Sequence, residues 1–448
     1  SEVDSNMIPR IFRCSSLFIL VLLLCFSVLP SASAVEFQDV PKNHWAYTEI
    51  AKMTAQGILQ GSGGLFHPEE LVSKQAFLSM VCRASGLDDR SLESGANWSA
   101  PAIAYGQYFG WFNEDEWNEP SAPITREFAA QLLVNAFFPE AVGTSEAIHF
   151  QDENDITSSR LPYVQAAVKL GLISGYADGT FLPKSGLTRA AAAALLSRSL
   201  LQEELVSGPK IQIPVLMYHD VSYLGHGYSK TPELFKKQMQ ELKDAGFHTV
   251  FFSEIINYVE QGTPLPSKPI VISIDDGYHS NYTYIYPILQ ELGMKAEISL
   301  IGDAIQYADW GMSWDEVREM AKSGLLSFQA HTKSLHSDHT AQGGRLGVLK
   351  IASESWSHYV RTLGNDTKAI LDLIEKEVGV RPQVFTYPRG KFNAMSEAVT
   401  SRLGCKVSLT TKDGVAQVRQ GDPSSLRLMD RIGMDFRNGS VVSVLKQF

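Results

Sequence analysis

Hydrophobic and polar positions divide the chain into two stretches with different patterns. Up to about residue 200, short apolar segments with helical spacing alternate with glycine-rich turns. From residue 213 onward, short apolar runs alternate with amphipathic helical segments. The runs predict strands at 213–219, 269–274, 296–301 and 326–329, with helices at 234–245, 284–292 and 314–323. Strands that alternate with helices predict a parallel sheet or barrel, with functional side chains at the carboxyl ends of the strands.

The first stretch contains an internal repeat. FQDV at residue 37 is followed by GILQG at residue 57, and FQDE at residue 150 is followed by GLISG at residue 171. A helix-like segment then begins after Ser73 and after Thr188, whose hydroxyls are good N-caps. Thr125 opens a third such segment, preceded by a degenerate first half at 105–117. The pattern predicts a bundle of repeated helix pairs.

These landmarks resemble the S-layer homology (SLH) repeat, a module that usually occurs in threes. We therefore expect an α-helical bundle of three SLH repeats over residues 35–200, the second degenerate. The resemblance implies noncovalent attachment to secondary cell-wall polymer, often through an anionic pyruvylated sugar. Cations near helix N-termini can pair with such a carboxylate; the alternative is that they are solvated surface and turn residues. The candidate polymer-binding residues are Trp45, Lys74, Arg126 and Arg189.

Ionisable residues follow the predicted strands of the second stretch. Asp275 and Asp276 come directly after one apolar run, and His331 and His336 come after another. Two histidines and one carboxylate form a facial ligand set that leaves open positions on a divalent ion. An Asp-Asp pair is more often a turn, and a His-x4-His spacing is often coincidence. Together, each after its own strand, they predict a metal site on Asp276, His331 and His336.

Three motifs in order resemble the polysaccharide deacetylase (NodB-homology) family: IDDGY at residue 274, HTKSLH at residue 331 and FTYPRG at residue 385. The resemblance implies a distorted β/α barrel. It also implies a hydrolase that removes N-acetyl groups from a β-linked polysaccharide containing N-acetylglucosamine. The implied roles are general base for Asp275, metal ligation for Asp276 and oxyanion binding for the backbone N–H of Arg389. The expected ion is Zn²⁺, although Co²⁺ and Ni²⁺ accept the same donors.

The chain departs from the commoner family pattern at two points. No histidine follows His358, and Phe385 stands where an arginine would precede Pro388 by three residues. The His-x4-His spacing and the opening YHDV at residue 218 are closer to the poly-β-1,6-N-acetylglucosamine deacetylase branch, which implies His219 as the general acid. A catalytically decayed, carbohydrate-binding protein is the alternative function. His339 is a spare ligand candidate, and the remaining histidines of this half are expected to be structural or surface residues: His226, His248, His279 and His358.

Residues 1–34 have the layout of a secretory signal peptide. Arg10 and Arg13 precede an apolar run at 17–29, and Ala32-Ser33-Ala34 supplies a small-residue cleavage site. The run is shorter than the roughly 20 residues of a spanning helix, so no transmembrane segment is expected in the mature chain. Only Cys82 and Cys405 remain after cleavage, in different expected domains, so a disulfide framework is not expected.

Composition and charge limit the classes of molecule that the protein is expected to bind. The chain is 44% hydrophobic and 20% charged, as soluble globular proteins are, and its net charge of −10 argues against nucleic acid. The expected partners are an N-acetylated polysaccharide and the secondary wall polymer, for a secreted protein bound to a bacterial cell wall. We expect four segments: the signal peptide (1–34), the SLH repeats (35–200), a linker (201–212) and the deacetylase domain (213–448).

Overall fold

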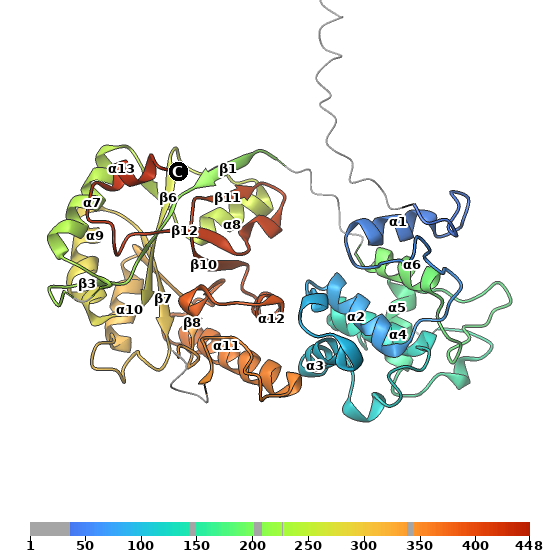
Figure 1. Ribbon diagram of the computed structural model, residues 1–448. Coiled ribbons are helices and arrows are strands. Elements are labelled where there is room, and N and C mark those ends of the chain that lie inside the picture. Colours follow the sequence, from blue (N-terminus) through green and yellow to red (C-terminus); the bar gives the residue numbers. More distant parts are fainter. Residues whose placement is uncertain (1–35, 144–147, 201–207, 226, 338–343) are drawn as a thin grey trace, which may run out of the picture.

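Figure 1 shows the computed structural model, in which a helical part precedes an α/β part. The structure describes residues 36–143, 148–200, 208–225, 227–337 and 344–448. The predicted signal peptide lies outside these residues. Within them, no helix combines the length and the apolar character that crossing a membrane requires.

Glycines at matching places reveal the repeat in the helical part. Gly57, Gly110 and Gly171 each lie two residues beyond the end of a helix, with φ of 72°, 70° and 69°. This left-handed conformation ends a helix at little steric cost only when the residue lacks a Cβ. The same backbone signal thus ends the first helix of each unit, including the middle unit that is degenerate in sequence.

The second helix of each unit begins in the same way. Ser73, Thr125 and Thr188 precede these helices, and each hydroxyl accepts a hydrogen bond from the backbone N–H three residues later. In the described residues up to 200, the helices therefore form three pairs: α1 (Tyr47–Ala55) with α2 (Lys74–Ala84), α3 (Ala100–Tyr108) with α4 (Arg126–Phe137), and α5 (Leu161–Lys169) with α6 (Arg189–Ser199).

Seven strands of the described C-terminal part close into a barrel. Their order is β2-β12-β10-β9-β8-β7-β6, β6 pairs back with β2, and every pairing in the ring is parallel. Strands buried on both faces are continuously apolar, which is the pattern that the sequence shows. The predicted distorted β/α barrel is confirmed. Its strands are β2 (Val215–Tyr218), β6 (Pro269–Asp276), β7 (Ala296–Ile301), β8 (Leu326–Thr332), β9 (Val384–Thr386), β10 (Val407–Asp413) and β12 (Met429–Gly433).

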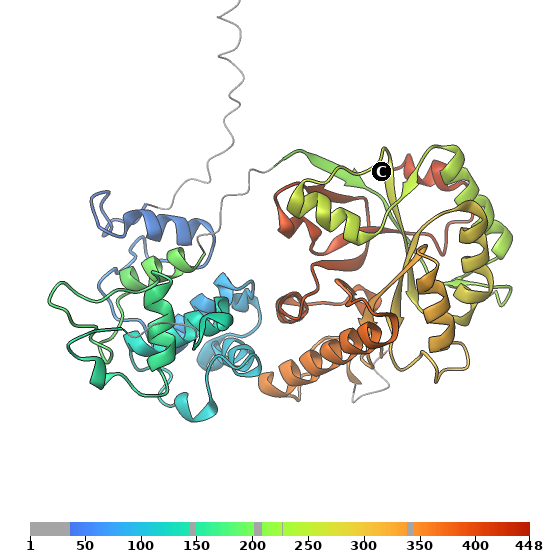
Figure 2. The same ribbon diagram turned by 180° about the vertical axis from the view of Figure 1, so that it is seen from behind.

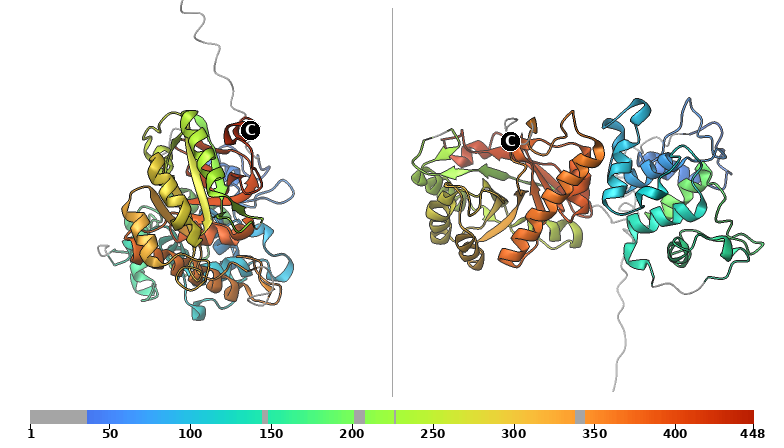
Figure 3. Two further views of the ribbon diagram at one scale, coloured as in Figure 1. Left: turned by 90° about the vertical axis from the view of Figure 1, so that its left-hand side faces the viewer. Right: turned by 90° about the horizontal axis from the view of Figure 1, so that it is seen from below.

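Helices surround the strands on the outside, as Figures 2 and 3 show from three further directions. The long helix α11 lies on the side that faces the helical part (Figure 3). The helices are α7 (Pro232–Asp244), α8 (Phe252–Gln261), α9 (Tyr286–Leu292), α10 (Trp314–Lys322), α11 (Trp356–Val378), α12 (Ala394–Arg402) and α13 (Val441–Leu445). Short strands complete the part: β1 (Lys210–Ile213), β3 (Asp220–Val221), β4 (Ser229–Lys230), β5 (His248–Thr249) and β11 (Ala416–Arg419).

The first strand differs from the expectation. Pro214 interrupts the run at 213–219, because a proline has no N–H to donate to a ladder. Residues before it form β1, which pairs antiparallel with β11. Since Lys210 to Gln212 are paired in this way, the α/β part begins inside the stretch expected to be linker.

Candidate functional site

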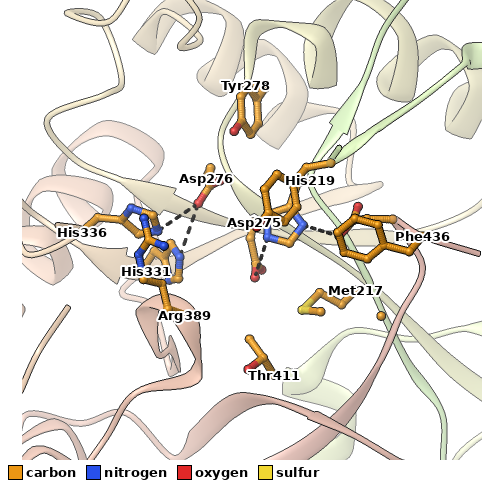
Figure 4. A pocket seen from close by; sticks show the side chains of 13 residues that line it. Met217, His219, Asp275, Asp276, Tyr278, His331, His336, Arg389, Thr411 and Phe436 are labelled. Atoms are coloured by element: carbon orange, nitrogen blue, oxygen red, sulfur yellow. Dashed lines mark hydrogen bonds and ion pairs between the residues drawn. The ribbon is translucent and has the colours of Figure 1, made fainter. Parts of the chain in front are cut away.

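The carboxyl ends of the parallel strands meet at one end of the barrel, around a cavity of about 460 Å³. Asp275 and Asp276 end β6, His331 lies at the end of β8, and His219 follows β2 directly. Figure 4 shows Asp276 beside His331 and His336 on one side, His219 on the other, and Asp275 between them. All six predicted catalytic and metal-binding residues line this cavity: Asp275, His219, Arg389, Asp276, His331 and His336.

These six residues, predicted from four separate motifs, are therefore neighbours in the fold.

The predicted metal ligands form a compact set. Nε2 of His331 and Nε2 of His336 each lie 3.4 Å from Oδ1 of Asp276, and the three donor atoms lie within 4.8 Å of one another. Metal–ligand bonds of about 2.0–2.1 Å in tetrahedral directions separate two donor atoms by about 3.3–3.4 Å. Asp276 has a φ of 78°, the left-handed turn that carries its carboxylate away from β6. The set has the dimensions that a divalent ion requires.

Hydrogen bonding prepares these donors for a cation. Nδ1–H of His331 donates to the carbonyl of Thr386 at 2.6 Å, which leaves the lone pair of Nε2 facing Asp276. Burial, with the nearby charge of His331, lowers the pKa of His336 to about 4, so its imidazole is neutral at pH 7. Oδ1 of Asp276 is buried and has no hydrogen-bond partner among the described residues. Such an orphaned oxygen beside two imidazole nitrogens fits a bound metal ion.

Arg431 holds the predicted base. Its Nη1 and Nη2 donate to the two carboxylate oxygens of Asp275, each at 2.8 Å, and both side chains are almost fully buried. Burial alone would raise the pKa of Asp275, but the charge and hydrogen bonds of Arg431 outweigh it and lower that pKa. Arg431 is itself held by the carbonyl of Thr410 and the hydroxyl of Ser273. Asp275 is thus kept ionised.

Asp435 holds the predicted acid in a similar way. Nδ1–H of His219 donates to Oδ2 of Asp435 at 2.7 Å, and Nε2 faces Oδ2 of Asp275 at 3.9 Å. Burial would lower the pKa of His219, but its hydrogen bond to Asp435 and the charge of Asp275 raise that pKa to about 9. At pH 7 His219 therefore carries a proton on the nitrogen that faces the cavity.

The rest of the cavity combines a turn and aromatic side chains. Arg389 lies in the turn after β9, with a φ of 56°. Tyr228 and Phe436 line the cavity on the His219 side, where their ring centroids are 5.6 Å apart. Tyr278 lines it near Asp276, and the Trp310 ring packs against Tyr278 with the two ring centroids 4.7 Å apart. The reacting groups thus lie between two pairs of aromatic rings.

Arg431 and Asp435 were not predicted from the sequence. Both follow the last deacetylase-like motif, on β12 and the loop after it. One signal was available for Arg431: it interrupts an apolar run, LMDRIGM at residue 428, where a charged strand residue needs a buried partner. Nothing local indicates that the partner is Asp275. No local signal distinguishes Asp435 from a surface aspartate.

Three other histidines of this half that the structure describes do not line the cavity. His248 and His358 are exposed, and His279 pairs with Glu316 outside it. His226 and the spare ligand candidate His339 lie outside the described residues.

The four predicted polymer-binding residues do not gather at one place. Trp45 and Arg126 line a second cavity, of about 440 Å³, in the helical part, together with Tyr176. Trp45 is 60% exposed, so its ring is available to a ligand. Lys74 and Arg189 lie outside this cavity.

Lys74, Arg126 and Arg189 occupy the first position of the second helix in their units, and each reaches a carbonyl of another unit. Nζ of Lys74 donates to Asn118, Nε of Arg126 to Phe181, and Nε of Arg189 to Phe66. The two arginines also stack on the rings of the residues they bond, with 4.9 Å for Arg126 and 4.6 Å for Arg189. These contacts close the three units on one another.

Comparisons with known proteins agree with this architecture. The polysaccharide deacetylase family matches residues 262–408, and the S-layer homology domain family matches residues 36–78 and 150–193. YxkH of Bacillus subtilis (strain 168), whose name places it among the polysaccharide deacetylases, is 29% identical over 47% of this chain and 68% of its own length. Poly-β-1,6-N-acetyl-D-glucosamine N-deacetylase of Escherichia coli (strain K12) is 27% identical over 42% of this chain, but only 31% of its own length. A de-N-acetylase structure from Aggregatibacter actinomycetemcomitans is 26% identical with a TM-score of 0.46, over 53% of this chain and 99% of that one.

The chain therefore carries an enzyme domain of the polysaccharide deacetylase class. S-layer homology domains precede it, and such domains associate a protein with the bacterial cell surface. The family match includes Asp275, Asp276, His331, His336 and Arg389, while His219, Arg431 and Asp435 lie outside it.

Proposed function

We propose that the protein hydrolyses N-acetyl groups of a β-linked polysaccharide that contains N-acetylglucosamine, while its SLH part holds it on the cell wall. The observation that carries the proposal is that one cavity contains the metal-ligand set, a carboxylate kept ionised and a histidine kept protonated. Hydrolysis of an amide needs a base and an acid at the same time, and opposite environments supply them here. A catalytically decayed site would not be expected to keep both supporting ion pairs.

Asp276, His331 and His336 would hold the ion, which we propose is Zn²⁺; Co²⁺ and Ni²⁺ accept the same donors. A divalent ion there would polarise the acetamide carbonyl and the attacking water. Asp275 takes a proton from that water as the water oxygen attacks the carbonyl carbon. Arg431 supports this role because it keeps Asp275 ionised and fixes both of its oxygens.

His219 gives its Nε2 proton to the amine nitrogen as the C–N bond breaks, so that acetate and a free amino sugar leave. Asp435 on Nδ1 fixes the ring orientation and favours the protonated form. The backbone N–H of Arg389, on the turn that lines the cavity, donates to the oxyanion of the tetrahedral intermediate.

The aromatic rings support a polymeric substrate. Phe436 is 72% exposed and Tyr228 is half exposed, although burial of such rings would be favourable. Rings that flank a cavity can pack against the apolar faces of sugars, and pairs lie on both sides of the reacting groups. We propose that the acetylated sugar sits between them, with its neighbours in the chain on either side.

In the helical part, we propose that Trp45 and Arg126 contact the wall polymer, with an acidic sugar in their shared cavity. Lys74 and Arg189 lie outside this cavity and donate to carbonyls of neighbouring units, so we propose that they hold the units together. We propose the same division of the chain as before: three SLH units over residues 35–200, a linker over 201–212 and a deacetylase domain over 213–448. The one difference is that β1 of the α/β part begins at Lys210, inside the proposed linker.

Replacement of a metal ligand tests the enzymatic proposal. His331→Ala and His336→Ala should each lower affinity for Zn²⁺ by at least about 10–100-fold, the loss seen when even a supporting residue is removed. Both should also lose release of acetate from N-acetylated glucosamine polymers. His279→Ala is the matched control, because His279 lies three residues after Asp276 but pairs with Glu316 outside the cavity.

Metal content after dialysis and acetate release from β-1,6-linked polymer, chitin and peptidoglycan are the measurements. Wild-type protein that binds the ion but releases acetate from none of these polymers would contradict the proposal and favour a carbohydrate-binding protein. Full turnover after the ion is removed would contradict the metal-dependent mechanism.

A further inference from the structure

A glycine marks the contact between the two parts of the molecule. Gly364 lies in the middle of α11, where it is buried against α3, and Figures 1 and 3 show these helices side by side. A Cβ at Gly364 would lie 2.2 Å from Cζ of Tyr108, closer than any real contact. Glycine is among the least favourable residues in a helix interior. Its place here is explained by the close approach of the Tyr108 ring.

Arg402 makes a second contact across the same boundary. Its Nη1 and Nη2 donate to the carbonyls of Ala136 and Asn135, in the last turn of α4, at 2.9 and 3.2 Å. The guanidinium also lies 5.2 Å from the Phe109 ring and 5.0 Å from the Trp111 ring. A cation at the C-terminal end of a helix satisfies carbonyls that the helix leaves unpaired.

Two further hydrogen bonds lie at the edges of this contact. The Tyr105 hydroxyl donates to the carbonyl of Ala398, and Nε1 of Trp356 donates to Glu93 at 2.9 Å. Apolar packing, a stacked cation and hydrogen bonds therefore join α3 and α4 to α11 and α12. We call the middle unit's side of this contact, Tyr105, Tyr108, Phe109 and Trp111, the docking face.

The other units lack a comparable face at the same positions. The glycine that ends each first helix aligns Tyr108 and Phe109 with the two residues before Gly57 and Gly171. Those residues are exposed in the structure, and none is aromatic: Ala55, Gln56, Lys169 and Leu170. Of the three described units, the middle one, whose SLH pattern is degenerate, has aromatic residues at these two positions. Its rings, Tyr108 and Phe109, are partly covered by the deacetylase domain.

We propose that the middle unit serves as a fixed dock for the deacetylase domain rather than as a third wall-binding repeat. The dock holds the catalytic cavity in one orientation relative to the polymer cavity at Trp45 and Arg126. Wall binding then decides which acetylated sugars the cavity reaches. The dock itself does not depend on the proposed activity, because the contacts that define it lie outside both cavities.

Gly364→Ala in the full chain tests the dock. Alanine is favourable within a helix, so α11 should not be weakened by the change itself, whereas the new methyl group collides with Tyr108. We expect a larger radius of gyration in X-ray solution scattering and separate thermal transitions for the two parts. Adding Tyr108→Ala makes room for the methyl group and should bring both measurements back toward wild type. Gln56→Ala, at the exposed position of the first unit that corresponds to Phe109, should change neither.

Acetate release supplies the functional readout. Gly364→Ala should retain turnover on a soluble oligosaccharide but lose turnover on isolated walls relative to wild type. The dock would be overturned if Gly364→Ala had the same radius of gyration as wild type. It would also be overturned if the double variant were no closer to wild type in scattering and thermal unfolding than the single variant. Altered scattering with unchanged turnover on walls would overturn its role in orienting the enzyme. Because scattering needs no catalysis, an inactive wild-type protein would contradict only the proposed function.

Discussion

Arg431→Met removes the charge that holds Asp275 while it keeps an unbranched side chain of similar length. The Arg431 side chain is 0% exposed and that of Asp275 is 2% exposed, so solvent does not screen the pair. Two hydrogen bonds to a charged group contribute about 1.5–3 kcal/mol each. Removal of one partner from a buried ion pair costs about 3–5 kcal/mol. We therefore expect the free energy of unfolding to fall by about 3–5 kcal/mol.

The pH dependence follows from the direction of the pKa shift. Arg431 lowers the pKa of Asp275 below that of an unfolded aspartate, about 3.9. The pair therefore contributes its full stability above that value, and the contribution is lost as pH falls through the folded pKa. Without Arg431, burial raises the pKa of Asp275. The acid limb of kcat/KM should move to higher pH, because a protonated carboxyl cannot accept a proton from water.

Urea unfolding of the metal-free protein and the pH profile of acetate release measure the two effects. Arg431→Lys keeps a charge but loses the paired geometry, so it should lie between wild type and Arg431→Met. Lys412→Met is the matched control: its partner Asp430 is the neighbour of Arg431 on β12, but Lys412 is exposed, and the expected loss is below about 1 kcal/mol. If Arg431→Met unfolds at the wild-type urea concentration and keeps its acid limb, Arg431 is not what keeps Asp275 ionised.

Two other predictions concern the acid and the wall. His219→Ala should reduce turnover of the sugar amide by about 10²–10⁴-fold, but much less that of an aryl acetate ester, whose leaving group needs no acid; equal losses would exclude His219 as the acid. The pKa of His219 is raised to about 9, so its contribution to stability is complete below the unfolded value of about 6.5 and is lost as pH rises through 9. Asp435→Asn should remove part of this rise in pKa and therefore move the basic limb of kcat/KM to lower pH. Trp45→Ala should reduce sedimentation of the full chain with walls that retain their secondary polymer, whereas Leu170→Ala, another exposed apolar residue, should not. Wild-type sedimentation that is equal with stripped walls would contradict polymer binding.

Features that depend on residues close together in the chain could be predicted from the sequence alone. Apolar runs of strand length predicted β6, β7 and β8, because a strand between helices is buried on both faces. Hydroxyl N-caps predicted the starts of α2, α4 and α6. The motif at Asp276 and that at His331 and His336 could be joined into one ligand set, because parallel strands end at the same edge of a barrel.

The distant residues that bind Asp275 and His219 could be identified only from the three-dimensional structure. Arg431 is 156 positions from Asp275, and Asp435 is 216 positions from His219, so closure of the barrel through β12 and β2 brings them together. The dock also depends on residues far apart in the chain, because the Tyr108 hydroxyl donates to Asn365 of α11, 257 residues later. A local pattern records periodicity and capping, whereas an ion pair or a close helix contact depends on register and chain closure across the whole fold.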